Sequence, residues 1–139
     1  MGKLGNCFLV WRRWLSRGYA RHDVSLKQYY LLRQLEGADY LYPADIADLL
    51  FCDRPTATVV IRNLEKAGWV RRGRDSQDGK RVRIALTDRG SEKLAELRDD
   101  PRRPERRFDP FACFSAEEKA QFDALLSRLA RHLEALPPE

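Results

Sequence analysis

One stretch of the sequence constrains the fold more than any other, because a helical pattern gives way within two residues to a pattern typical of strands. Over residues 54–67 the apolar side chains recur at intervals of three and four and so share one face of a helix: Ala57, Val60, Ile61, Leu64 and Ala67. Gly68 then supplies a candidate helix end. Residues 69–72 and 82–86 alternate in polarity, and the polar residues between them include Asp78-Gly79, a typical hairpin turn. The junction predicts a mainly α fold with a small β-hairpin.

Start and stop signals predict three helices ahead of this junction. Residues 4–21 carry apolar side chains at helical spacing: Leu4, Phe8, Trp11, Leu15 and Tyr19. Ser25 and Gln28 have the spacing of a capping box, and Gly37 ends the helix that they begin. Pro43 opens a short third helix with Ile46, Ala47 and Leu50 on its buried face. Asp53 begins the fourth helix after a break of two residues.

Two further helices are expected after the hairpin. Thr87 caps a fifth helix that runs past Leu94 and Leu97. A charged connector, broken by prolines, follows over residues 98–114. Ser115 and Glu118 repeat the capping-box spacing ahead of a last helix, over residues 115–136.

Length and composition narrow the function. The 139 residues suit one domain, and the 43% hydrophobic share indicates a folded chain. We expect a cytoplasmic protein that does not enter a membrane, because no apolar run approaches about 20 residues. Three distant cysteines and two histidines predict neither a disulfide framework nor a metal site. Catalytic and cofactor-binding patterns are also missing, so we expect no enzyme and no cofactor.

Three short helices followed by a hairpin are typical of a winged helix-turn-helix, whose third helix enters the major groove of DNA. Opposite the apolar stripe, the helix over residues 54–67 carries polar and basic side chains suited to bases and phosphates. Val59 is suited to a thymine methyl group. The hairpin adds Arg74, Lys80 and Arg81. The predicted DNA-binding residues are Thr56, Thr58, Val59, Arg62, Asn63, Lys66, Arg74, Lys80 and Arg81, although a polar helix face is often only a solvated one.

Five short motifs fall in order over about residues 24–97: the helix 26–35, Ile46-Ala47 through Asp53-Arg54, Leu64-Glu65-x-x-Gly68, Asp75-x-x-Asp78 and Leu86-Thr87-x-x-Gly90. This arrangement resembles the MarR (multiple antibiotic resistance regulator) family of transcription factors. The resemblance implies one MarR-like domain over residues 1–139, with the winged lobe at residues 24–97. It also implies a homodimer, joined through the helices 4–21 and 115–136, that binds double-stranded DNA at a pseudo-palindromic operator. We expect this dimer to regulate transcription as a repressor.

Composition independently supports dimerisation. The two terminal helices carry more apolar surface than a lobe of this size is able to cover. The predicted interface residues are Phe8, Trp11, Leu15, Phe122, Leu126, Leu129 and Leu133. The alternative is that these helices pack on their own lobe.

The chain departs from the family's pattern at its DNA-contacting positions. Pro55 stands where a serine is usual, Val59 where a base-contacting arginine is common, and Gly79 where an arginine often enters the minor groove. Arg62 and Asn63 therefore become the better candidates for reading bases, and Lys80 or Arg81 for the wing contact. The operator is not predictable by analogy.

The effector is open between two classes. Cys7 in the first helix resembles the reactive thiol of the family's branch that senses organic hydroperoxides, with Tyr19, Tyr29 and Tyr30 as candidate partners; a packed, inert cysteine is the alternative. The second class is a small aromatic ligand, bound between the dimerisation helices and the lobe by Trp11, Trp14, Tyr29, Tyr30 and Tyr40, unless these rings are only core. Cys52 is expected in the core, and Cys113 in a loop as a resolving or an idle thiol.

One rival function belongs to a different class. A winged helix also serves as a protein interaction module that binds no specific DNA, since a fold does not fix a function. The role of the arginines at residues 102–107, in DNA contact or only as a linker, is not set by the sequence.

Overall fold

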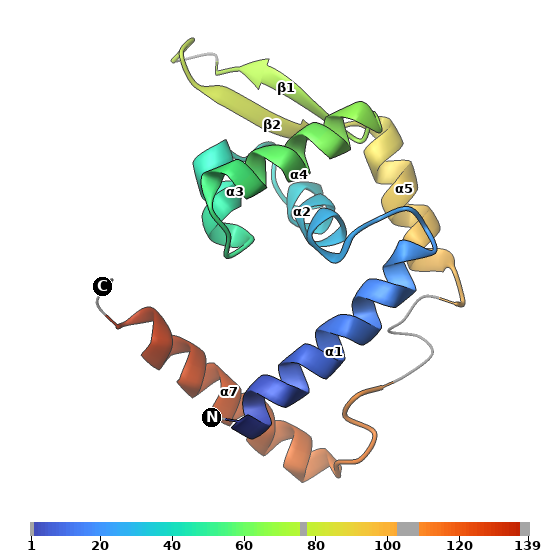
Figure 1. The fold of residues 1–139 in the computed structure, drawn as a ribbon, viewed down its shortest axis with the longest axis vertical. Helices are drawn as coiled ribbons and strands as arrows, with labels where there is room; N and C mark the ends of the chain where they lie inside the picture. Colours follow the sequence, from blue (N-terminus) through green and yellow to red (C-terminus); the bar gives the residue numbers. More distant parts are fainter. Residues whose placement is uncertain (1, 76–77, 103–108, 137–139) are drawn as a thin grey trace. The chain divides into compact units, whose positions relative to one another are not determined.

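The computed structural model describes residues 2–75, 78–102 and 109–136, and the chain divides into two compact units (Figure 1). Among the residues described, the first unit (residues 1–107) contains five helices and a hairpin, and the second (residues 108–139) contains one helix. The elements of the first are α1 (Gly2–Ala20), α2 (Leu26–Glu36), α3 (Pro43–Leu49), α4 (Arg54–Lys66), β1 (Val70–Arg74), β2 (Val82–Leu86) and α5 (Asp88–Asp99). The second contains α7 (Ala116–Glu134). The predicted mainly α fold with one hairpin is confirmed.

The helices begin and end where the sequence signals them. The Ser25 hydroxyl accepts the Gln28 N–H at 3.2 Å, and the Gln28 side chain accepts the Ser25 N–H at 2.8 Å, which completes the first capping box. Ser115 and Glu118 form the second in the same way. Thr87 caps α5 by accepting the Gly90 N–H at 3.1 Å.

Both ends of α4 are fixed by local hydrogen bonds. At its start, the Asp53 carboxylate accepts the Thr56 N–H at 2.8 Å. At its end, Gly68 has a φ of 76°, the Gly68 N–H donates to the Glu65 carbonyl, and the Trp69 N–H donates to the Leu64 carbonyl. This pair of bonds around a left-handed residue is a Schellman motif, which favours glycine at the position of Gly68. The motif directs the chain from α4 straight into β1.

Replacing Asp53 by alanine removes the cap of α4 and is expected to lower the melting temperature by about 5 °C. The hydrogen bonds from Thr56 lower the pKa of Asp53, so its stabilising effect is fully present above the ordinary pKa near 4 and is lost as the pH falls through the folded-state value. Thermal melts should therefore show a gap between wild type and Asp53→Ala at pH 7 that narrows below about pH 4. Asp53→Asn retains the acceptor and serves as the control; an equal loss in both variants would contradict the capping role.

The hairpin is joined to the segment between α2 and α3. β1 and β2 are antiparallel, in register from Val70 opposite Leu86 to Arg74 opposite Val82. Leu41 forms a bridge to Ile84, in which each residue donates its N–H to the other's carbonyl at 2.9 Å. β1 extends two residues beyond the predicted residue 72, because Gly73 and Arg74 still pair with β2. The bridge adds a short third line of pairing and fixes the base of the hairpin.

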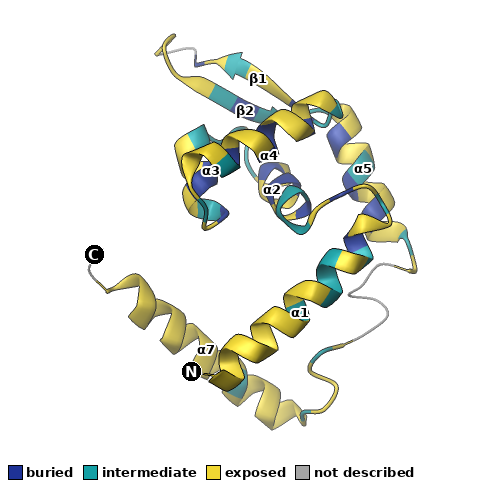
Figure 2. Cartoon of the chain, in the orientation of Figure 1, coloured by how far each residue is buried: buried dark blue, intermediate teal, exposed yellow. Residues whose placement is uncertain are grey.

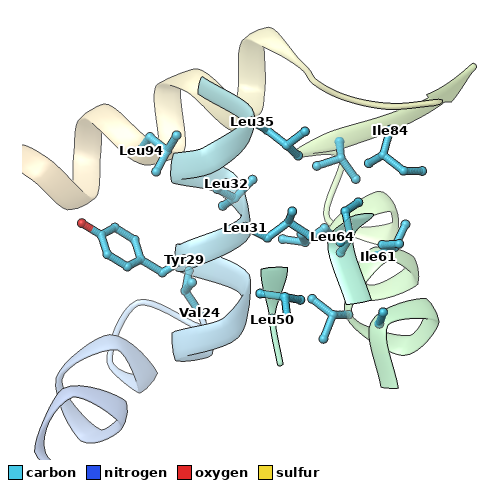
Figure 3. Close-up of a cluster of buried hydrophobic side chains, with 14 of the residues drawn as sticks. Val24, Tyr29, Leu31, Leu32, Leu35, Leu50, Ile61, Leu64, Ile84 and Leu94 are labelled. Carbon is cyan, nitrogen blue, oxygen red and sulfur yellow. The ribbon is translucent and has the colours of Figure 1, made fainter. Parts of the chain in front are cut away.

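The core of the first unit surrounds α2 (Figure 3). Leu31, Leu32 and Leu35 of α2 are buried, and they share the hydrophobic cluster with side chains of α3, α4, β2 and α5. These include Ile46, Ala47, Leu50, Ala57, Val60, Ile61, Leu64, Ile84, Leu94 and Leu97, so the buried faces predicted for these helices are confirmed.

α5 is held to the lobe at both ends. In its first turn, Gly90 lies so close to the Trp69 carbonyl oxygen that an added Cβ would stand 2.1 Å from it. Near its other end, Arg98 pairs with Glu36 of α2 at 2.5 Å, and His22 lies 3.4 Å from Asp100. The chain around α5 is therefore tied both to the hairpin and to the end of α1.

The apolar stripe of α1 is covered only toward its C-terminal end. Tyr19 is fully buried and Leu15 packs against the core, whereas Leu4 and Phe8 are 50% and 58% exposed (Figure 2). In the second unit, no residue of α7 is buried, and Leu125, Leu126, Leu129 and Leu133 are all exposed. Phe122 instead packs against Phe111 and Phe114 of the preceding segment, at ring distances of 5.8 and 5.5 Å.

Parts of two predicted segments, residues 76 and 77 of the polar tip and residues 103–108 of the connector, lie outside the described residues. Within the described ranges, no helix is both long enough and apolar enough to cross a membrane.

Candidate nucleic-acid interface

The outer face of α4 carries the side chains predicted to contact DNA. The amphipathic pattern buries Ala57, Val60, Ile61 and Leu64, and this fixes the opposite side toward solvent. Arg62, Asn63 and Lys66 are exposed, and Val59 is 43% exposed. In the described part of the chain no ion pair engages Arg62 or Lys66. Both cations therefore stay available to an external anion.

The two threonines of α4 differ in what they offer. Thr58 is exposed, and its hydroxyl donates to the Arg54 carbonyl at 2.9 Å, so only its lone pairs face an incoming group. Thr56 is half-buried, and its N–H is engaged by Asp53.

One acidic side chain interrupts the basic surface. Glu65 accepts a hydrogen bond from Arg72 of β1 at 2.9 Å, and each side chain is about two-fifths exposed. This ion pair compensates the charge of Arg72, one of the cations of the hairpin. Arg74 and Lys80 are exposed and have no such partner among the residues described.

The tip of the hairpin, called the wing below and comprising residues 78–81, is shaped by two aspartates. The Arg81 N–H donates to the Asp78 carbonyl at 2.9 Å, and the Lys80 N–H donates to the Asp78 carboxylate at 3.1 Å. The Asp75 carboxylate pairs with Arg83 at 2.8 Å, while the Asp75 N–H donates to the Arg81 carbonyl at 2.9 Å. Arg83 lies on β2, opposite Gly73.

Sequence reasoning missed the aromatic residues under the wing. The Arg81 guanidinium lies 3.6 Å above the ring of Tyr42, and the Arg83 guanidinium lies 4.0 Å from the ring of Tyr40. The Tyr42 hydroxyl donates to Asp75. The alternation Tyr40-Leu41-Tyr42, with one aromatic on each side of Leu41, is a strand-like signal that indicates the pairing of this segment with the hairpin but not the contacts of the two rings with Arg81 and Arg83.

The structure does not bring the candidate redox residues together within one chain. Cys7 is exposed, whereas Tyr19, on the same helix, is buried and stacks on Tyr29 at 4.2 Å. Twelve residues of helix separate Cys7 from Tyr19, which is about 18 Å along the axis. Tyr30 is 43% exposed on the outer side of α2. Tyr19 and Tyr29 therefore form a pair in the core that is separate from the exposed Cys7.

The other cysteines and aromatics are divided among several places. Cys52 is half-buried and packs against the core, as predicted, and Cys113 is exposed. Trp11 and Trp14 stack on each other at 5.4 Å on α1. Tyr40 lies under the guanidinium of Arg83 on β2. The pocket of about 400 Å³ between α2 and α5 is lined by Tyr29, Arg33, Glu36, Leu94 and Arg98.

The comparisons with known proteins agree on one family. The model of the MarR family matches residues 22–81. The transcriptional regulator PecS of Dickeya dadantii is 32% identical over 136 residues, which cover 96% of this chain and 81% of PecS. MepR of S. aureus, solved in complex with DNA, is 25% identical with a TM-score of 0.78, over 94% of this chain and 96% of that one.

A third likeness extends to a ligand-bound protein. PcaV, a transcriptional regulator from Streptomyces coelicolor solved with its natural ligand, is 25% identical with a TM-score of 0.74, over 91% of each chain. The family model, the similarity to PecS over 96% of this chain and the shared architecture lead to one conclusion. The chain belongs to the MarR family of winged helix-turn-helix transcriptional regulators.

Proposed function

We propose that the protein is a dimeric, sequence-specific DNA-binding repressor whose two winged lobes contact a pseudo-palindromic operator. The observation that carries the proposal is the exposed, basic outer face of α4, continued by Arg74, Lys80 and Arg81 of the hairpin. MepR, with the same architecture, is solved in complex with DNA. In this arrangement α4 enters the major groove, where Arg62 and Asn63 read base edges, and the wing contacts the backbone.

The proposed dimer is supported by the exposed apolar surfaces of both units. Phe8 on α1 and Leu126, Leu129 and Leu133 on α7 form stripes at helical spacing that nothing within the described chain covers. Such contiguous apolar faces usually mark an interface. Trp11, Leu15 and Phe122 are half-buried at the edges of these stripes. A second copy of the chain supplies matching faces, as the two-fold symmetry of an operator requires.

Fluorescence anisotropy on duplexes from around the protein's own gene, titrated with salt, tests the proposal. If each lobe makes about four phosphate contacts, a dimer makes about eight, and the slope of log K against log salt should be about −7. Tight binding to one duplex with this slope supports the repressor. A slope near zero, or equal affinity for every duplex, would favour the rival reading, a protein interaction module.

Lys80→Ala should weaken binding evenly across sequences and reduce the salt slope by about 2 for a dimer, because one phosphate contact is lost from each lobe. Anisotropy on an operator and on a scrambled duplex measures both effects. Lys93→Ala, a substitution on α5 that removes the same charge, provides the control. Unchanged binding by Lys80→Ala would remove the wing from the proposed interface.

The proposed effector belongs to one of two classes, and Cys7 separates them. Its exposed thiol is accessible to oxidants. In the redox reading, the thiolate attacks an organic hydroperoxide, the O–O bond breaks, and sulfenic acid forms on Cys7 while the alcohol leaves. In the ligand reading, a small aromatic molecule binds and the cysteine is not involved. This reading is supported by the similar protein PcaV, which is solved in complex with its natural ligand.

Repeating the anisotropy titration after a hydroperoxide, and again after a thiol reductant, decides between them. Release that the reductant reverses and that Cys7→Ser abolishes supports the redox reading. Cys113→Ser, on the other exposed thiol, is the matched control. If the hydroperoxide leaves the complex intact, the search moves to aromatic ligands.

A further inference from the structure

A cluster of five side chains joins the wing to the segment ahead of α3. It comprises Tyr40, Tyr42, Asp75, Arg81 and Arg83, and it is called the wing clamp below. Asp75 and Tyr42 are 33 residues apart in the sequence. Neither the α4 surface nor the hydrophobic core accounts for this cluster, so its role requires a separate explanation.

Asp75 is the centre of the wing clamp. Its residue is only 6% exposed, although it lies beside the wing. Its carboxylate accepts hydrogen bonds from the Tyr42 hydroxyl, from Arg83 at 2.8 Å and from the Asp78 N–H at 3.1 Å, while its own N–H donates to the Arg81 carbonyl at 2.9 Å. A buried carboxylate is costly unless it is satisfied in this way. These bonds therefore tie the hairpin to the segment ahead of α3.

The two tyrosines form the floor of the wing clamp. Their rings meet edge to face at 5.4 Å, and each lies under one arginine, Tyr42 under Arg81 and Tyr40 under Arg83. The hydrogen bond from Tyr42 to Asp75 raises the pKa of Tyr42 to about 12. The separate hydrogen bond from Arg83 to Asp75 raises the pKa of Arg83. Tyr42 thus stays a neutral donor, and Arg83 stays a cation, throughout the neutral range.

The wing clamp engages the cations of the hairpin to different degrees. Arg83 is half-buried and paired with Asp75, so its charge is compensated inside the protein. Arg81 is exposed, but its guanidinium is held against Tyr42. Lys80 donates its N–H to the Asp78 carboxylate, and Asp78 in turn donates its N–H to the Asp75 carboxylate. The position of Lys80 and Arg81 therefore depends in part on the buried Asp75 and the half-buried Tyr42.

We propose that Tyr42 and Asp75 are positioning residues that fix the direction in which the wing leaves the lobe, and thereby place Lys80 and Arg81 for contact with DNA. The placement of Lys80 and Arg81 for contact with DNA rests on the proposed function. A helix-turn-helix and a wing bind one duplex together only if the angle between them is set. The Leu41–Ile84 bridge fixes the base of the hairpin, and the wing clamp fixes the part beyond it.

The first test uses no DNA. Tyr42→Leu removes the hydroxyl and the ring, and Tyr42→Phe removes only the hydroxyl. Amide hydrogen exchange, followed by NMR, should become at least about tenfold faster at Asp75 and Ile84 in Tyr42→Leu, with a smaller change in Tyr42→Phe, while Leu94 of α5 keeps its wild-type rate. Unchanged rates at Asp75 and Ile84 would overturn the wing clamp. Faster exchange at Leu94 as well would show a general loss of stability and would also contradict it.

The second test is the salt dependence of DNA binding. Tyr42→Leu removes no charge, yet it should lower the salt slope by about 4 for a dimer, twice the effect of Lys80→Ala, because both Lys80 and Arg81 leave the DNA backbone in each lobe. The double variant Tyr42→Leu/Lys80→Ala should bind no more weakly than the worse of the two single variants. A slope equal to that of wild type, or losses that simply add, would overturn the positioning role.

The two proposals fail in different ways. If wild-type protein shows no salt-dependent binding to any duplex, the proposed function and the DNA part of the inference are both refuted, and hydrogen exchange still decides whether the wing clamp holds the wing. If wild type binds and the Tyr42 variants bind with the same slope, the function stands and the inference falls.

Discussion

Gly90→Ala is expected to destabilise the winged lobe by about 3 kcal/mol or more and to lower its melting temperature by at least about 10 °C. The added Cβ would stand 2.1 Å from the Trp69 carbonyl oxygen and 2.7 Å from a methyl group of Leu86. The first of these neighbours is backbone at the start of β1, so a side-chain rotation does not relieve the clash. Either α5 moves away from the hairpin or the hairpin loses its register.

Circular dichroism melts and urea titrations measure this effect. Gly79→Ala is the matched control, because an added Cβ at that position meets nothing within 4 Å. It should change the free energy of unfolding by less than about 0.5 kcal/mol. Equal stability of Gly90→Ala and wild type would show that the first turn of α5 does not pack against Trp69 as described.

Arg62→Ala is expected to weaken operator binding by about 10- to 100-fold and to relax the preference for one base pair in each half-site. Arg62 is exposed on the face of α4 opposite Ile61 and Leu64, where its charge meets no carboxylate within the part of the chain that is described. In the proposed dimer each lobe loses the same contact. The effect should therefore exceed that of Lys80→Ala on the operator, and should be smaller on a scrambled duplex.

Anisotropy with an operator and with duplexes changed at single base pairs measures this preference. Arg21→Ala removes the same charge from an exposed turn after α1 and provides the control. If Arg62→Ala loses affinity equally for every duplex, Arg62 contacts only phosphates. If it loses none, α4 does not enter the groove with the face proposed here.

The helices and the hairpin were predictable because their signals are local. Ser25 with Gln28 and Ser115 with Glu118 act over three residues, and Gly68 ends α4 by its own backbone conformation. The outer face of α4 followed from the same periodicity that buries Leu64. Signals of this kind operate within one or two turns, so the sequence displays them directly.

The features that were missed depend on contacts between distant segments. Nothing near Asp75 in the sequence indicates that its partners are Tyr42 and Arg83, because the choice is made when the hairpin folds onto the α2–α3 segment. The same reason explains why Tyr19 and Tyr29, adjacent to each other in the core, are remote from Cys7. Helical periodicity placed Phe8 and Tyr19 on one stripe but did not tell which part of the stripe the lobe covers.

The partial burial of α1 has a mechanical consequence. The helix is about 28 Å long, and only its last turns, at Leu15 and Tyr19, are fastened to the lobe. It therefore behaves as a lever with its fulcrum at the stacked pair Tyr19 and Tyr29. A tilt of about 10° at this fulcrum displaces the far end by roughly 4 Å. In the proposed dimer, the far end of α1 packs against a second copy of the chain, so the same small tilt changes the distance between the two copies of α4. An operator whose half-sites lie one helical turn apart binds only a dimer in which this distance matches.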